Sequence, residues 1–167
     1  RNGENSIVGL LFHALPSSHK DFPAFEALSD ILTTRPSGLA YQALVETKMA
    51  TNVSSYVFSW KDPGVFQIFA EVPKDKSADA VKRSLTDIML GISTLEVTPT
   101  QLKRFKTKMK KSFNLFFANS QRVALALSES AASGDWRLLF LSRDNIEKRT
   151  KKQIQRVAEQ YFVRSNM

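Results

Sequence analysis

The fold of this chain is decided by residues 37–73, SGLAYQALVETKMATNVSSYVFSWKDPGVFQIFAEVP. The stretch opens with an amphipathic segment from Leu39 to about Thr47, whose apolar spacing predicts a helix. Residues 50–60 and 64–73 are rich in β-branched and aromatic side chains, which favour strands. The short Lys61-Asp62-Pro63-Gly64 connection predicts a hairpin between the two strands.

The segments before this stretch predict one more strand and one more helix. Residues 6–15 form a nearly continuous apolar run, which is typical of a strand covered on both faces or at the centre of a sheet. From Asp21 to Thr34 apolar residues recur every three or four positions, which predicts a helix that Pro36-Ser37-Gly38 ends. No repeat or low-complexity linker interrupts the 167 residues, so we expect a single compact α/β (α+β) domain over 1–167.

The chain after Ser77 is predicted to be helical. Thr98-Pro99-Thr100-Gln101 has the pattern of a capped helix start, and Ser120, Asp144-x-x-Glu147 and Thr150-x-x-Gln153 give further start signals. Gly134 is expected to end the helix that begins near Ser120. Because Leu138 to Leu141 are all apolar, we expect Trp136 and the turn around it to be anchored in the core.

The formal net charge of +8 is concentrated in the second half of the chain, where residues 98–167 carry 15 Lys and Arg against five Asp and Glu. The basic helix expected over 101–119 could contact an acidic partner or simply be a solvated face. Its aromatic residues, Phe105, Phe113, Phe116 and Phe117, share a side with leucine and methionine. They are therefore interpreted as core rather than as platforms for bases, and no nucleic acid is expected as a partner.

The residues needed for catalysis within this chain are missing. Cysteine is absent, and the only two histidines, His13 and His19, are separated by a Pro-Ser-Ser turn, with Glu26 on a different segment. A hydrolytic zinc site needs about three converging protein ligands. No G-x-S-x-G elbow and no glycine-rich phosphate loop occurs. We therefore expect no catalytic residue, no metal and no cofactor in this chain.

Several segments together resemble one known family. They are the helix-strand-strand order of 37–73, PSSHKDFPAFEALSDIL at 16–32, VTPTQLKR at 97–104, SQRVALALSESAASGDWRLLF at 120–140 and TKKQIQRVAEQYF at 150–162. In this order they resemble the domain repeated in the pitrilysin/insulinase (mitochondrial processing peptidase-like) zinc metallopeptidases. The likeness is to a non-catalytic second domain of a long bacterial member, since the H-x-x-E-H zinc helix is absent. Because the chain begins at Arg1 rather than Met, we expect a piece of a larger multi-domain peptidase.

The resemblance implies a split βαβ-type sheet covered by helices, the metallopeptidase-like "LuxS/processing-peptidase" domain. It also implies pairing with a homologous zinc-bearing domain of the same protein, in a chamber that holds a peptide substrate. Some partner domains bind the substrate backbone through an Arg and a Tyr, whose positions fall here on Val45 and Asn52, so no substrate clamp is expected.

The resemblance further implies a structural role for the loop-helix residues Gly38 and Tyr41, and we assign structural roles to Gly64, Gly134 and Trp136 as well. It points to a periplasmic or membrane-associated place in a bacterium, and a weak homodimer is expected once the domain is separated from its partner. Two alternatives stay open. One is a purely structural scaffold without peptidase activity, and the other is a basic binding module for an acidic partner.

Overall fold

A computed structural model describes residues 5–58, 60–94 and 97–167. Strands β1 (Asn5–Ala14), β2 (Asn52–Val57) and β3 (Gly64–Pro73) form an antiparallel sheet in the order β1-β3-β2. Because β1 and β2 both run antiparallel to β3, they are parallel to each other, with a helix between them in the chain and β3 inserted between them in space. This is the split βαβ arrangement that was expected. The second strand was predicted to reach residue 60, and Ser59 lies outside the described residues.

The sheet has one buried face and one open face. Along β3 the buried side chains alternate strictly, as the two-residue period of a strand requires. The buried face presents Leu10 opposite Ile68, and Phe12 opposite Phe66. Ile7 and Leu11 of β1 point to the opposite face, and Ile7 is 73% exposed. One face of the sheet therefore supplies the core and the other is free.

The prediction for residues 6–15 was right about the strand and wrong about its surroundings. β1 lies at an edge of the sheet, and its residues alternate between buried and exposed. A continuous apolar run normally marks burial on both faces. Here the second set of apolar side chains, including Ile7 and Leu11, faces away from all described helices.

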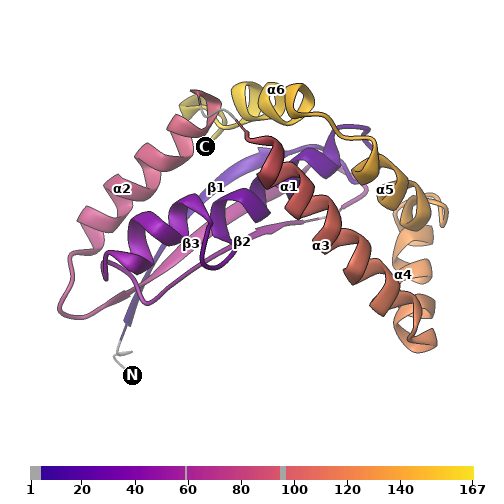
Figure 1. Ribbon diagram of the computed structural model, residues 1–167, viewed down its shortest axis with the longest axis horizontal. Helices are drawn as coiled ribbons and strands as arrows, with labels where there is room; N and C mark the ends of the chain where they lie inside the picture. The colour runs from indigo at the N-terminus through magenta and orange to yellow at the C-terminus, as the bar shows by residue number, and fades with distance from the viewer. Residues whose placement is uncertain (1–4, 59, 95–96) are drawn as a thin grey trace.

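The buried face of the sheet is covered by helices, as Figure 1 shows. They are α1 (Phe22–Thr33), a wide π-helix η1 (Tyr41–Glu46), α2 (Ala78–Gly91) followed by the 3-10 turn η2 (Ile92–Thr94), and α6 (Lys151–Tyr161) followed by η3 (Arg164–Asn166). Phe162, directly after α6, is fully buried, and its ring contacts those of Phe12, Phe25 and Phe66 with centroids 4.8 to 5.9 Å apart. The residue that follows the last α-helix thus packs against the first strand in the core.

Helix α3 (Pro99–Phe117) leaves this core and leads to α4 (Ser120–Ala132) and α5 (Leu138–Glu147), as Figure 1 shows. We call residues 110–141 the helical arm. None of its side chains is buried, whereas Phe105 and Ile146 on either side of it are. The arm is held together by ring contacts, since Phe117 stacks on Phe113 and on Phe140 with centroids 6.3 and 5.6 Å apart.

This arm corrects one prediction about the aromatic residues of the basic helix. Phe105 is in the core, as expected. Phe113, Phe116 and Phe117 are only partly buried. Phe113 still packs against the edge of the core, whereas Phe117, one turn further on, stacks on Phe140 of α5. The apolar spacing of these residues reflects contacts between helices of the arm. Sequence periodicity alone does not distinguish such contacts from contacts with the core.

Trp136 also lies elsewhere than predicted. Its side chain is 55% exposed in the turn between α4 and α5. Among the described ring pairs it forms one, a nearly perpendicular pair with Phe140. Leu138 and Leu139 are partly buried and Leu141 is exposed. The apolar run after Gly134 therefore belongs to the arm and does not anchor the turn in the core.

Two of the four helix starts predicted from capping patterns are found as expected. Thr98 and Thr150 both form complete capping boxes, with Gln101 and Gln153 respectively. The cap of α4 is Asn119 rather than Ser120, because the Asn119 side chain accepts from the backbone N–H of Arg122. Asp144-x-x-Glu147 does not start a helix, since both residues lie in the last part of α5. Among the described residues no helix is long and apolar enough to cross a membrane.

Candidate functional site, a polar cleft beside helix α1

The residues with the chemistry for zinc do not converge. His13 is exposed near the end of β1, and His19 lies in the following turn, where its Nδ1 accepts from the Asp21 backbone N–H at 3.1 Å. Within the described ranges no group of three or more His, Cys, Asp or Glu could hold a metal ion. These side chains do not fit zinc.

Glu26 shows why α1 is not a zinc helix. In an H-x-x-E-H pattern centred on this glutamate, the two histidine positions are Pro23 and Ala27. Both are buried, and neither side chain carries a ligand atom. Helix α1 thus lacks both histidines of the zinc pattern.

The two positions assigned to a substrate clamp have other contacts. Val45 packs against the hydrophobic core from η1. Asn52 begins β2 and is engaged by its neighbours, since Arg35 donates to its Oδ1 at 2.6 Å and its Nδ2 donates to Ser54 Oγ at 3.3 Å. A valine has no donor or acceptor in its side chain. An asparagine lacks the ring of a tyrosine.

Two of the glycines assigned a structural role lie where the backbone is crowded. A Cβ on Gly38 would come within 2.6 Å of the Leu32 carbonyl oxygen, and one on Gly64 within 2.5 Å of the Phe58 carbonyl oxygen. Gly134 has a φ of +113°, a conformation that favours glycine. Tyr41 is partly buried against the core, and the Arg35 guanidinium lies 5.6 Å from its ring centroid.

The structure brings together a set of polar side chains of which only Glu26 was considered from the sequence. They line a cleft of about 600 Å³ between α1, α3 and β2. Its lining residues are Glu26, Ser29, Asp30, Thr33, Thr34, Arg35, Ser55, Phe105, Lys108 and Met109. The signal was present in α1, where Glu26, Asp30 and Thr34 recur at four-residue spacing on a helix whose other faces are apolar.

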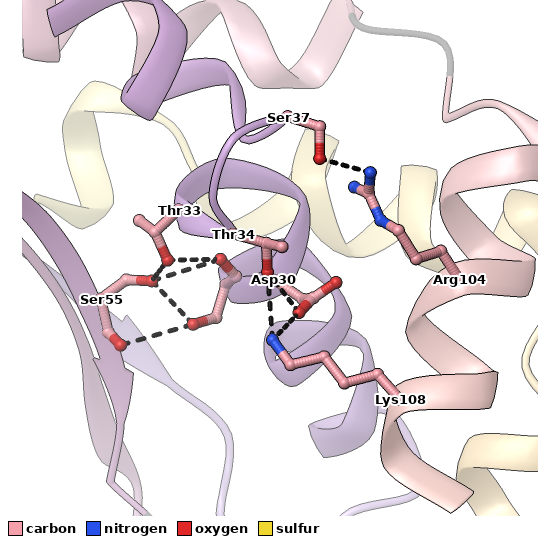
Figure 2. Close-up of polar contacts among 8 residues, drawn as sticks. Asp30, Thr33, Thr34, Ser37, Ser55, Arg104 and Lys108 are labelled. Carbon is pink, nitrogen blue, oxygen red and sulfur yellow. Dashed lines mark hydrogen bonds and ion pairs between the residues drawn. The ribbon is translucent and has the colours of Figure 1, made fainter. Parts of the chain in front are cut away.

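Two hydrogen-bonded groups make up the polar wall of this cleft (Figure 2). In the first, Lys108 of α3 forms an ion pair with Asp30 at 2.5 Å, and Thr34 Oγ1 donates to the same oxygen, Oδ1, at 2.5 Å. In the second, Ser55 of β2 shares hydrogen bonds with the hydroxyls of Ser29 at 2.7 Å and Thr33 at 3.0 Å. These contacts tie α1 to both the sheet and α3.

Several buried polar atoms near the cleft have no partner. They include Glu26 Oε2, Asp30 Oδ2, and Nε and one Nη of Arg104, whose other Nη donates to Ser37 Oγ. Burial raises the pKa of Glu26 from 4.5 to about 7, because the charged carboxylate loses its hydration. A buried polar group without a partner costs about 1–3 kcal/mol. The wall of the cleft therefore contains buried carboxylate oxygens that could still accept hydrogen bonds.

A separate ion cluster fixes the start of α1 to the end of the chain. Asp21 is buried, and its carboxylate forms ion pairs with Arg149 at 3.2 Å and with Arg156 at 2.6 Å. Arg149 also donates to the Lys20 carbonyl oxygen. Since removing one member of a buried ion pair typically costs about 3–5 kcal/mol, this cluster is interpreted as structural.

Comparison with known proteins places this geometry in a family. The family model described as the peptidase M16 inactive domain matches residues 1–109, which comprise the sheet, α1, η1, α2 and the first part of α3 but not α6. The crystal structure of the inactive peptidase domain of a proposed zinc protease from Bordetella parapertussis is 33% identical. It superimposes with a TM-score of 0.93 over 99% of this chain and 89% of that one.

Two further relatives agree. A proposed zinc protease from Bordetella pertussis is 32% identical, with a TM-score of 0.90 over 96% of this chain and 89% of that one. The zinc protease PqqE of Helicobacter pylori is 25% identical over 157 residues, which are 93% of this chain and 35% of that protein. The chain thus spans about a third of the length of this curated relative. With the family model matching well over half of its length, the chain belongs to the family of peptidase M16 inactive domains.

Proposed function

We propose that this chain is the non-catalytic partner of a homologous zinc-bearing domain in the same protein, and that it helps to form the chamber in which that domain cleaves peptides. The observation that carries the proposal is the match to an inactive peptidase domain in a chain that corresponds to about a third of a longer zinc protease. In this proposal the zinc and its ligands belong to the partner domain.

The helical arm is the surface proposed for pairing. It exposes four large apolar side chains, Leu115, Leu125, Trp136 and Leu141. Exposed apolar patches on a soluble protein often mark a site where a partner binds. The ring contacts of Phe117 and Phe140 fix α3 against α5 and thereby hold this surface in one shape.

The open face of the sheet is the surface proposed for the chamber wall. Ile7 and Leu11 of β1 and Tyr56 of β2 are exposed on it, and the Tyr56 ring stacks on Phe69 at 5.7 Å between centroids. A wall of this kind offers mainly apolar and aromatic contacts. Such contacts suit peptide side chains of varied sequence.

The proposal is tested by mixing this chain with the zinc-bearing domain of its parent protein. We expect a one-to-one complex in analytical ultracentrifugation, and faster zinc-dependent hydrolysis of a fluorogenic peptide than with the zinc-bearing domain alone. Leu125→Glu should weaken the complex, because it places a charge in the apolar surface of the arm. Gln160→Glu adds the same charge on the exposed side of α6 and should leave the complex intact.

Two outcomes separate this proposal from its alternatives. A stable complex without any gain in hydrolysis would favour the purely structural role. Absence of a complex at every protein concentration and salt concentration would contradict the pairing itself.

A further inference from the structure

The cleft between α1 and α3 contains two carboxylates that each keep one oxygen unused. Glu26 and Asp30 are four residues apart on α1 and therefore lie on the same face of the helix. Both line the cleft, and both Glu26 Oε2 and Asp30 Oδ2 are buried without a hydrogen-bond partner. The side chain of Asp30 is only 6% exposed. Two buried acceptors in the wall of the same cleft suit a ligand with several donors.

The rest of the cleft wall suits a ligand with an apolar stem. Phe105 and Met109 of α3 line the cleft opposite α1. The hydroxyls of Ser29, Thr33 and Ser55 bond to one another, and each hydroxyl oxygen has two lone pairs, so they add further acceptors. Long basic side chains bind in this way, with the methylene stem on an apolar surface and the charged head on acceptors.

Lys108 provides an example within the chain itself. Its ammonium group reaches from α3 into the cleft and binds Asp30 Oδ1 at 2.5 Å, as Figure 2 shows. Lys108 pairs with one oxygen of Asp30 only, and Asp30 Oδ2, like Glu26 Oε2, is left without a partner. Arg35 also lines the cleft, but its guanidinium is engaged by Asn52 at 2.6 Å and by the Tyr41 ring.

We propose that this cleft is a binding site for an alkylguanidinium group, whose N–H donors bond to Glu26 Oε2 and Asp30 Oδ2 while its alkyl stem packs on Phe105 and Met109. A planar guanidinium has five N–H donors and can serve two carboxylates at once. A metal ion fits less well, since within the described ranges no third carboxylate or histidine joins these two and Lys108 lies beside Asp30. The group belongs either to a small molecule or to an arginine of a peptide.

Binding of this group is linked to a proton. The pKa of Glu26 is raised to about 7, so at pH 6 most molecules carry a neutral Glu26 and must lose a proton to bind a cation fully. Besides Glu26, the charged residues that line this cleft are Asp30, Arg35 and Lys108, and Lys61 and Glu129 line the neighbouring cleft that Glu26 also lines. Arg104 of α3 reaches the segment after α1, where it donates to Ser37 Oγ. Binding should tighten from pH 6 to pH 8 and release a proton at pH 6.

The experiment uses the full chain and two ligands of nearly equal shape. Butylguanidinium and the neutral butylurea are titrated while the amide resonances of Ser29 and Ser55 are followed by NMR. We expect butylguanidinium to bind at least about tenfold more tightly, because charge-assisted hydrogen bonds are the stronger ones. A second pair, Gly-Arg-Gly and Gly-citrulline-Gly, shows whether the site also accepts the group on a peptide.

Variants assign the binding to the two carboxylates. Glu26→Gln and Asp30→Asn should each weaken butylguanidinium binding about tenfold, the scale of one charge-assisted bond, and Glu26→Gln should also abolish the proton release. Glu159→Gln, an exposed glutamate on α6, is the matched control and should change neither. Lys108→Met should tighten binding, since it removes the internal competitor for Asp30.

The site is refuted if butylurea binds as well as butylguanidinium, if neither ligand shows saturable binding, or if Glu26→Gln leaves affinity and proton release unchanged. Circular dichroism of each variant shows whether a loss of binding reflects a loss of fold. None of these measurements needs the zinc-bearing domain or any hydrolysis. A failure here therefore leaves the pairing proposal untouched, and the converse also holds.

Discussion

Among individual residues, Glu26 has the environment least like that of a surface glutamate. The residue is partly buried, and its Oε2 is enclosed without a hydrogen-bond partner. Its pKa is raised to about 7 in the folded protein, against 4.5 for the ordinary side chain. The folded protein therefore holds this proton more tightly than the unfolded chain does, and the resulting stability is lost as the pH rises toward and through 7.

We predict that the stability of the Glu26→Gln variant, relative to that of the wild type, increases when the pH is raised from 5 to 8. At pH 8 the buried carboxylate costs at most about 3 kcal/mol, since each tenfold change in acid dissociation is worth about 1.4 kcal/mol. Urea denaturation at the two pH values measures the difference. A gain that is the same at both values, or that Glu159→Gln reproduces, would mean that the Glu26 carboxyl is hydrated.

Gly38 is the other residue where a small change should have a large effect. A Cβ there would lie within 2.6 Å of the Leu32 carbonyl oxygen and within 2.7 Å of the Thr34 nitrogen, both of which belong to the backbone. We expect Gly38→Ala to cost about 1–3 kcal/mol, as overpacking does elsewhere. At Gly91, at the end of α2, an added Cβ would meet no described atom within 4 Å apart from its own helix backbone and chain neighbours, so Gly91→Ala should stabilise by about 0.5–1 kcal/mol. Equal denaturation midpoints for the two variants would contradict this contrast.

Among the elements, α3 joins two parts of the molecule that differ in burial. Its start depends on the capping box in which Thr98 accepts from the Gln101 N–H and Gln101 accepts from the Thr98 N–H. We expect Thr98→Ala to lower the free energy of unfolding by about 1 kcal/mol. Thr100→Ala, which alters an exposed threonine two residues further on, is the control and should have less than half of this effect.

The far part of α3 and the turn after α4 should be insensitive to truncation. Trp136→Ala should cost about 1 kcal/mol or less, since the indole is more than half exposed and contacts mainly Phe140. Phe105→Ala, at the buried end of α3, should cost about 3–5 kcal/mol. Thermal denaturation of both variants checks the contrast. A loss at Trp136 as large as that at Phe105 would mean that the arm is part of the core.

The elements also show what the sequence could and could not predict. The hairpin of β2 and β3, α1 and the capping boxes of α3 and α6 follow from local patterns, and all are confirmed. The open face of β1 and the exposure of Trp136 were missed, because apolar periodicity does not say whether a core, another helix or a partner covers a face. The polar cleft was missed because its residues come from α1, β2 and α3, and only the fold brings them together.

At the scale of the whole molecule, charge and apolar surface oppose each other. The net charge of +8 repels copies of the chain from one another, whereas the exposed apolar side chains of the arm favour association. We predict that the separate chain forms weak dimers whose association strengthens with salt, because salt screens the repulsion. Sedimentation velocity over a salt series measures this. A binding module for an acidic ligand would behave in the opposite way, since its complex would weaken with salt.

The lack of buried side chains in the helical arm has a consequence for how the molecule opens. Regions with few buried contacts open locally at a lower free energy than the core does, and their amide hydrogens exchange sooner with solvent. The amides of α4 should exchange well before those of β3, while the sheet is still closed. Association with a partner domain through the arm would slow this exchange. Two populations of amides with different lifetimes would then mark the boundary near residue 110, where α3 leaves the core.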